Sequence, residues 1–182
     1  MSVTIATQTD TQTLLSDLLA QHRGIVVKFA GTYSWHPDYL EDLSQEIVTQ
    51  LWRAFSRYDD TQSFSTWMYR VALNVSISWV RRQSTRQRHT VAFDDDTHEV
   101  ADVSNVPDED GRIAFLQRFI DGLDSLNRAL MLLYLEEQSY RDIAEILGIS
   151  ETNVATKIGR LKQRVREQSA ELNDEGATNG TQ

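Results

Sequence analysis

The sequence contains no cysteine, only two prolines and no long uninterrupted hydrophobic run. Without cysteine the chain can form neither disulfides nor a zinc–thiolate site. No segment reaches the roughly 20 apolar residues of a membrane-spanning helix, and the first residues lack the basic and apolar regions of a secretion signal. We therefore expect a cytoplasmic protein with no membrane insertion. The scarcity of proline and the abundance of helix-forming residues predict an all-α fold.

Acidic residues outnumber basic ones, and the net charge of −9 by itself argues against nucleic acid as a partner. The distribution of the charges reverses that argument. Residues 89–111 hold eight acidic residues and no lysine or arginine, whereas residues 81–88 hold four arginines and residues 157–166 hold five cations and no acid. Two basic clusters are therefore left to which a nucleic acid could bind.

The region between Ser139 and Arg166 has the pattern of two helices joined by a tight turn. Ser139 and Asp142 have capping-box spacing at the start of the first helix, Gly148 suits a positive φ at its end, and Ser150 can cap the second helix. The apolar residues of each helix lie on one face. This arrangement is that of a helix-turn-helix, whose second helix reads DNA, although an ordinary helical hairpin has the same pattern.

The polar side of the second helix supplies candidate DNA-binding residues. Short polar groups near its start suit base edges, and cations further along suit phosphates. These candidates are Thr152, Asn153, Thr156, Lys157, Arg160 and Arg164. The cations could instead form an ordinary solvated face, but such faces usually intersperse both signs of charge.

Apolar periodicity in the N-terminal half predicts three helices, from about Thr13 to Tyr33, from Asp38 to Ser56 and from Ser65 to Arg82. His22 is expected at the edge of the core. The third helix is expected to bury one stripe, consisting of Trp67, Val71, Val75 and Trp79. Trp35 and Trp52 are likewise assigned packing roles only. The first twelve residues, rich in threonine and glutamine, are expected to be disordered.

Residues 89–111 are polar and acidic, and they are expected to form a flexible connector. Two further helices are predicted at 113–123 and 126–136, and the chain beyond about residue 173 is expected to be disordered. The acidic cluster at 94–96, with His98 and Glu99, lacks the glycine-shaped geometry of a hard-metal loop. We therefore expect no metal here. The sequence also lacks the nucleophile–base spacing and the ligand pair of an enzyme, so we expect no cofactor and no enzymatic activity.

Residues 42–82, DLSQEIVTQLWRAFSRYDDTQSFSTWMYRVALNVSISWVRR, resemble the second conserved region of bacterial sigma factors. Residues 139–166 resemble the fourth conserved region. The order of the two regions in a short chain is similar to the extracytoplasmic-function (ECF) class. This resemblance implies a bacterial protein with two small helical domains, at 13–88 and 112–170, joined by a flexible acidic linker at 89–111. The second domain would be the helix-turn-helix domain.

The resemblance also implies partners and site residues. The protein would direct core RNA polymerase to promoter DNA, and an anti-sigma factor is a further candidate partner. In the family, the helix that resembles Asp42–Glu46 docks on polymerase, so Asp42, Gln45, Glu46 and Thr49 are expected to bind it. The loop at 57–63 and the next helix would open and read melted promoter DNA. The residues assigned to that role are Arg57, Ser65, Trp67, Arg70, Asn74, Arg81 and Arg82.

Several of these assignments have alternatives. Phe64, Trp67 and Tyr69 could stack on unpaired bases, but the spacing of Trp67 from Val71 also suits a core position. Arginines at a helix end also suit the helix dipole. Asn127 and the pair Thr152-Asn153 depart from residues common in the family, so promoter preference cannot be transferred.

Two other functions compete with the sigma-factor interpretation. The first is a stand-alone helix-turn-helix regulator, in which residues 13–82 would serve as a dimerisation or sensor domain. The second is a small hydrolase that uses the Asp/His cluster, but the sequence lacks any nucleophile–base spacing.

Overall fold

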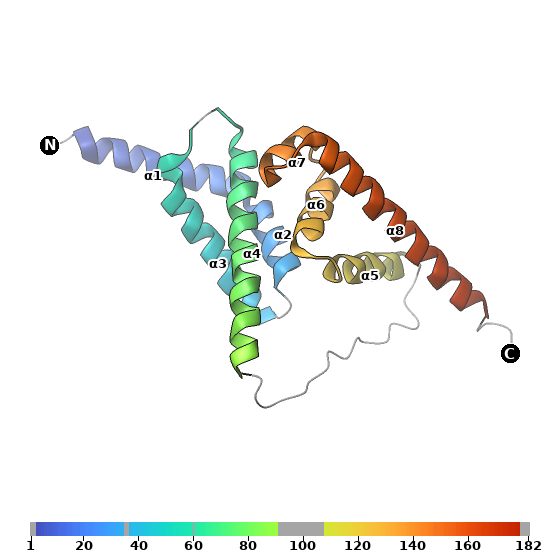
Figure 1. The fold of residues 1–182 in the computed structure, drawn as a ribbon. Coiled ribbons are helices and arrows are strands. Elements are labelled where there is room, and N and C mark those ends of the chain that lie inside the picture. The colour runs from blue at the N-terminus through green and yellow to red at the C-terminus, as the bar shows by residue number, and fades with distance from the viewer. Residues whose placement is uncertain (1–2, 35–36, 60, 91–107, 179–182) are drawn as a thin grey trace. The chain divides into compact units, whose positions relative to one another are not determined.

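The computed structural model describes residues 3–34, 37–59, 61–90 and 108–178. The chain divides into two compact units, residues 1–94 and 95–182. Every element in the described ranges is a helix, as Figure 1 shows. The all-α prediction is therefore confirmed. Each unit has its own apolar core, and the two are described separately.

The first unit contains five helical elements: α1 (Val3–Gln21), α2 (Arg23–Tyr33), α3 (Pro37–Ala54), the 3-10 helix η1 (Phe55–Arg57) and α4 (Phe64–Thr90). Helices α2, α3 and α4 pack against one another in all three pairs. Side chains from four of the helices fill the core. The largest of these that are less than 2% exposed are Leu15, Phe29, Tyr33, Leu43, Ile47, Leu51 and Met68.

The first predicted helix is in fact two helices, because the backbone leaves helical geometry at His22 (φ −106°, ψ 16°). The half-buried His22 ring lies 5.6 Å from the ring of Phe64, which confirms its position at the edge of the core. Helix α1 begins at Val3, so the expectation of twelve disordered residues is wrong. This stretch contains neither glycine nor proline, and it extends a helix that the fully buried Leu15 anchors.

Of the stripe predicted for α4, Trp67 is buried, but the other three residues are not at the centre of the covered face. The centre of its covered face holds Met68, Ala72 and Ser76, all 0% exposed, whereas Val71 and Val75 are only half-buried. Both α2 and α3 pack on α4, so the covered face is broad and is centred about one residue further along the chain than the apolar stripe indicates. The small side chains at 72 and 76 allow close packing there.

The second unit contains α5 (Asp108–Asp121), α6 (Ser125–Leu135), α7 (Tyr140–Leu147) and α8 (Glu151–Thr178). Helix α8 packs against each of the other three. Side chains less than 2% exposed form the centre of the core, and they are Leu130, Leu133, Ile143, Val154 and Ile158. Helix α8 continues past residue 173, where disorder was expected, and α4 continues past Arg82 to Thr90. Residues 91–107, most of the predicted linker, lie outside the described residues.

The corner between α5 and α6 is held by polar contacts. The Asp124 carboxylate caps α6 by accepting hydrogen bonds from the backbone N–H groups of Leu126 (3.1 Å) and Asn127 (3.0 Å). The Asn127 side chain also donates to Asp124, a contact that a proline at this position could not make. These hydrogen bonds, chiefly the one from the Asn127 backbone, lower the pKa of Asp124. The Arg128 guanidinium donates to the carbonyl of Ile120 at 3.2 Å and so ties α6 to α5.

Candidate functional site

Helices α7 and α8 form the predicted helix-turn-helix. The Ser139 hydroxyl accepts from the backbone N–H of Asp142 at 3.1 Å and donates to its carboxylate at 2.6 Å. Gly148 ends α7 in the left-handed conformation (φ 67°, ψ 33°), which suits glycine because it has no Cβ. The backbone N–H of Asn153 then donates to the Ser150 hydroxyl at 3.2 Å, which caps α8. The local signals of the sequence therefore act as predicted.

Helix α8 has one buried side and one exposed side. Val154, Ile158 and Leu161 are at most 2% exposed and face the core. Five of the six predicted DNA-binding residues of this helix are exposed, namely Thr152, Asn153, Thr156, Arg160 and Arg164, while Lys157 is half-buried. The polar residues near the start of α8 and the cations further along are thus presented together, as base edges and phosphates require.

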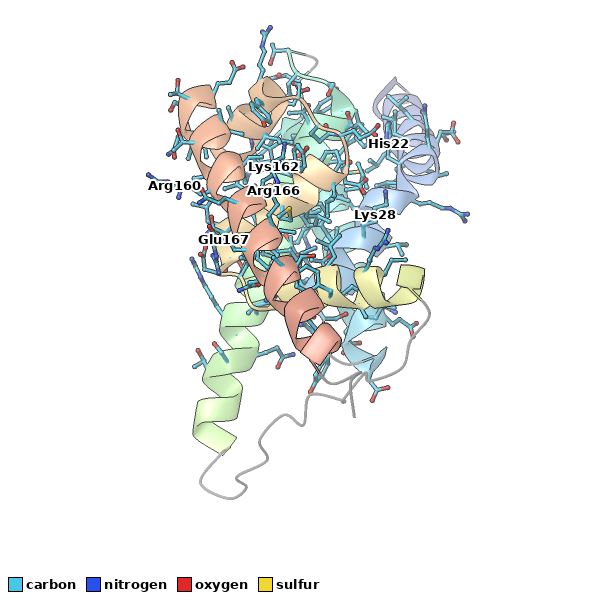
Figure 2. The ribbon with its side chains drawn as sticks, turned by 90° about the vertical axis from the view of Figure 1, so that its right-hand side faces the viewer. His22, Lys28, Arg160, Lys162, Arg166 and Glu167 are labelled. Carbon is cyan, nitrogen blue, oxygen red and sulfur yellow. The ribbon has the colours of Figure 1, made fainter. Side chains whose placement is uncertain are left out.

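The cations of α8 differ in what they contact within the unit. Arg160 makes no contact with an aromatic ring or an acid in the part of the chain that the structure describes, and Figure 2 shows it extending away from α8. By contrast, the Lys162 ammonium lies 4.2 Å from the ring centroid of Tyr134, and the Arg164 guanidinium lies 5.6 Å from that of Phe119. A hydrogen bond with Tyr134 is the main cause that raises the pKa of Lys162.

Lys157 is half-buried, and its charge is one of the lesser causes that lower the pKa of Asp124. The five basic residues between 157 and 166 are consequently not equivalent. Lys162 and Arg164 help to hold α8 on α5 and α6 by cation–π contacts. Arg160 is the candidate best placed for a phosphate.

In the first unit, the predicted polymerase-binding residues lie on the outside of α3. Asp42, Gln45 and Thr49 are exposed and Glu46 is half-exposed. The opposite side of α3 carries Leu43, Ile47 and Leu51, which are 0% exposed. These polar groups are therefore available to a partner without disturbance of the core.

Trp52 was assigned a packing role only, but it is 39% exposed, so part of its side chain is also accessible to a partner. It lies on the same side of α3 as Gln45 and Thr49, at spacings of seven and three residues. The sequence analysis missed it because an apolar residue beside an apolar stripe suggests a core position. The available signal was its place one residue past the fully buried Leu51, because one residue turns a side chain about 100° around the helix.

A groove of about 360 Å³ runs between α3 and α4. Its lining residues are Glu46, Gln50, Ala54, Val71, Asn74, Val75, Ser78 and Arg82. The groove brings the predicted polymerase-binding residue Glu46 together with two predicted DNA-binding residues, Asn74 and Arg82. The Arg82 guanidinium lies 3.8 Å from the Glu46 carboxylate, and their side chains are 54% and 32% exposed. This pair is solvated, so it links the two predicted surfaces only weakly.

The aromatic residues near the start of α4 are buried. Trp67 is 7% exposed, and its ring lies 5.2 Å from that of Tyr58, 5.4 Å from that of Phe64 and 6.1 Å from that of Phe55. Tyr69 is 5% exposed and lies against Phe29. Trp67 therefore occupies the core position that its spacing allowed. Stacking of these rings on unpaired bases would require the cluster to open.

The remaining candidates of the first unit are more accessible. Arg57 in η1 and Asn74, Arg81 and Arg82 in α4 are exposed, while Ser65 and Arg70 are half-exposed. The loop before α4 is held by local hydrogen bonds, including one of 3.1 Å from the Tyr58 hydroxyl to the carbonyl of Gln62. The Ser63 hydroxyl accepts from the backbone N–H of Thr66 and so caps α4.

Among the described residues, no helix is both long and apolar enough to cross a membrane. The described residues also contain no cluster of three side chains suited to bind a metal ion. The acidic cluster at 94–96 lies outside them.

Both units are helical in their described residues, and the second unit contains a helix-turn-helix whose second helix has an exposed polar side. Residues 18–86 match the family model of sigma-70 region 2, and residues 113–165 match that of sigma-70 region 4. The chain therefore belongs to the sigma-70 family of sigma factors, and relatives described next are named as members of its ECF class.

Individual relatives are similar to this chain at moderate identity. The ECF RNA polymerase sigma factor SigX of Bacillus subtilis is 31% identical over 122 residues, which cover 64% of this chain and 63% of SigX. SigE of Mycolicibacterium smegmatis is 29% identical over 166 residues, which cover 88% of this chain and 63% of SigE. The chain thus spans less than two thirds of the length of these two relatives.

Two solved structures have a similar fold. The sigma factor RpoE of Bartonella quintana, in complex with the anti-sigma factor NepR, has a TM-score of 0.66 at 18% identity. That likeness covers 84% of this chain and 94% of RpoE. CnrH, in complex with the cytosolic domain of CnrY, has a TM-score of 0.62 at 22% identity and covers 90% of each chain.

Proposed function

We propose that this protein directs core RNA polymerase to specific promoters and has no catalytic activity of its own. The observation that carries the proposal is the presence of sigma-70 regions 2 and 4 in that order in one chain. The exposed helix-turn-helix supports it, because this motif places its second helix in the major groove of duplex DNA. The polymerase would synthesise the RNA, in the bacterial cytoplasm.

The polymerase-docking surface in this proposal is the outer side of α3. It consists of Asp42, Gln45, Glu46, Thr49 and Trp52. The first four supply polar and charged groups to a partner, and their exposure supports the assignment. Trp52 adds an exposed aromatic side chain, a residue type enriched among the energetically dominant residues of interfaces.

The DNA-binding surface of the second unit is the exposed side of α8. Thr152, Asn153 and Thr156 would contact base edges, and Arg160 would contact a phosphate. Lys157 and Arg164 are assigned secondary roles, because Lys157 is half-buried and Arg164 lies over the ring of Phe119. The upstream promoter element would be read here as duplex.

The first unit would hold the melted part of the promoter. The residues proposed for this role are Arg57, Ser65, Arg70, Asn74, Arg81 and Arg82. Their accessibility supports contacts with the nucleic-acid backbone and with base edges. Trp67 is buried among other aromatic rings. We therefore propose that it supports this surface from below and does not itself contact a base.

For the domain organisation we propose a polymerase-binding domain at 13–88, an acidic linker at 89–111 and a helix-turn-helix domain at 112–170. The linker carries eight of the 27 acidic residues of the chain and no lysine or arginine. A polyanion tethered beside two basic clusters can compete with DNA phosphates at low ionic strength. We therefore expect the free chain to bind duplex DNA weakly until polymerase holds both domains on one promoter.

An anti-sigma factor is proposed as a further partner. Both RpoE of Bartonella quintana and CnrH, which share this fold, were solved in complex with a second protein, and for RpoE that protein is the anti-sigma factor NepR. Co-purification of the chain from its natural cell would identify such a partner.

Two measurements with purified components test the proposed function. In gel filtration, the full chain should co-elute with core RNA polymerase, and in run-off transcription it should confer initiation at defined promoters. A stand-alone regulator, the main alternative, would bind duplex DNA without polymerase and would not co-elute with it. Failure to co-elute, together with tight binding to DNA alone, would establish that alternative.

A further inference from the structure

Gly159 lies well inside α8 (Glu151–Thr178), on the side that faces away from the core. Val154, Ile158 and Leu161 occupy the opposite, buried side of the helix. At helical spacing, Thr152 and Thr156 precede Gly159 by two turns and one turn on the same exposed side. Gly159 therefore lies next to Thr152 and Thr156 on the exposed side of α8, more than a quarter turn from Asn153 and Arg160.

Nothing within the unit requires a glycine at this position. A Cβ added to Gly159 would meet no heavy atom within 4 Å, so a side chain would fit the free protein. Nor is the backbone there left-handed, in contrast to Gly148, which needs its positive φ of 67° to end α7. A glycine inside a helix costs about 1 kcal/mol relative to alanine. The chain therefore carries a destabilising residue for which the packing of the unit gives no reason.

The residues that precede Gly159 on its own side of the helix, Thr152 and Thr156, have short side chains. The Thr156 hydroxyl donates to the carbonyl of Thr152 at 2.9 Å, which folds this short side chain back on the helix. Asn153 and Arg160, which are longer, are exposed along one flank. The major groove is only about as wide as an α-helix with its side chains. A bare Cα beside Thr152 and Thr156 would therefore let this side of the helix enter more deeply.

We propose that Gly159 is the point of closest approach between α8 and duplex DNA, and that the missing side chain sets the depth at which the helix lies in the groove. Gly159 would be a positioning residue, because its bare Cα lets Asn153 and Thr152 reach the base edges. The inference rests on the proposed function and deepens it, since it names what fixes the distance between the helix and the bases.

The test uses the full chain assembled with core RNA polymerase. The wild-type assembly is first used to select DNA duplexes from a randomised pool, and the selected duplexes then serve as the probes. Gly159→Ala and Gly159→Gln replace the glycine with good helix formers of increasing size. Gly31→Ala is the matched control, because Gly31 is an exposed glycine of α2 at which an added Cβ also meets nothing within 4 Å. Arg160→Ala is the control for the proposed phosphate contact.

We expect Gly159→Ala to weaken binding to the enriched duplexes about tenfold, the loss of one good base contact, and Gly159→Gln to weaken it further. At the same time, the melting temperature of Gly159→Ala should rise by about 4 °C, since alanine stabilises the helix. Gly31→Ala should bind the duplexes as the wild type does. A gain in stability with a loss in binding is a combination that a purely structural glycine would not give.

The outcomes separate the inference from the proposed function. If Arg160→Ala weakens binding but both Gly159 variants bind as the wild type does, α8 contacts DNA and the inference is overturned. Loss of stability in Gly159→Ala would overturn it as well, because the steric argument requires that a Cβ fits the free protein. If the wild-type assembly enriches no duplex, or Arg160→Ala has no effect, the proposed role of α8 is refuted and the inference is refuted with it.

Discussion

Removal of the two acidic groups on the outer side of α3 should separate polymerase binding from folding. The perturbation is the double variant Asp42→Ala with Glu46→Ala. The side chains that hold α3 in the core, Leu43, Ile47 and Leu51, are 0% exposed and lie on the opposite side of the helix. The substitutions therefore leave the core untouched.

The cost to stability can be worked out from the contacts that Glu46 makes. Its carboxylate lies 3.8 Å from the guanidinium of Arg82 and accepts a hydrogen bond of 3.2 Å from Gln50. Because the paired side chains are 54% and 32% exposed, this pair contributes less than about 1 kcal/mol. Alanine recovers a few tenths of a kcal/mol through its higher helix propensity. The free energy of unfolding should therefore change by less than about 1 kcal/mol.

The effect on polymerase binding should be larger. A charge-assisted hydrogen bond across an interface contributes about 2 kcal/mol, which corresponds to about a 30-fold weaker affinity when it is lost. The assay is titration of fluorescently labelled full chain with core RNA polymerase, accompanied by thermal unfolding followed by circular dichroism. Asp17→Ala, which removes an exposed carboxylate from α1, is the matched control.

Arg82→Ala breaks the same ion pair from the other side and should leave the affinity for polymerase nearly unchanged. It therefore distinguishes loss of the docking groups from loss of the ion pair. Unaltered affinity of the double variant would refute the docking assignment. A weaker affinity accompanied by reduced helicity would refute the claim that this side of α3 is free of structural roles.

Three further predictions address the recognition helix, the core and one cap. Asn153→Ala should change which upstream sequences are preferred, by about 1–3 kcal/mol, whereas Arg160→Ala should weaken all promoters alike and reduce the salt dependence of binding, both measured by anisotropy on a promoter panel. Met68→Ala, at a 0% exposed position, should lower the free energy of unfolding by about 2–5 kcal/mol, and the half-buried Val75→Ala by clearly less, in urea titrations. Asp124→Ala should cost about 1 kcal/mol at neutral pH through loss of the α6 cap. Since folding lowers the pKa of Asp124, its contribution is present above the ordinary value of 3.8 and is lost as the pH falls through the folded pKa, so acid unfolding curves of variant and wild type should converge there.

The sequence by itself determined the features that depend on local interactions. The capping box of Ser139 and Asp142, the left-handed Gly148 and the cap at Ser150 involve residues at most three positions apart or a single backbone conformation. The side of α3 that faces solvent was also predictable, apart from Trp52, because its other polar and apolar residues largely separate. The polar residues at the start of α8 were identified for the same reason.

Only the tertiary structure decided which surfaces neighbouring helices cover. Both α2 and α3 pack on α4, so its buried face is centred on Met68 and Ala72 rather than on the most apolar stripe. Likewise, Arg164 and Arg160 look alike in sequence, but only Arg164 lies over an aromatic ring, that of Phe119 on another helix. Periodicity shows where a helix is apolar, whereas the direction and number of the neighbours that pack on it depend on contacts between residues far apart in the chain.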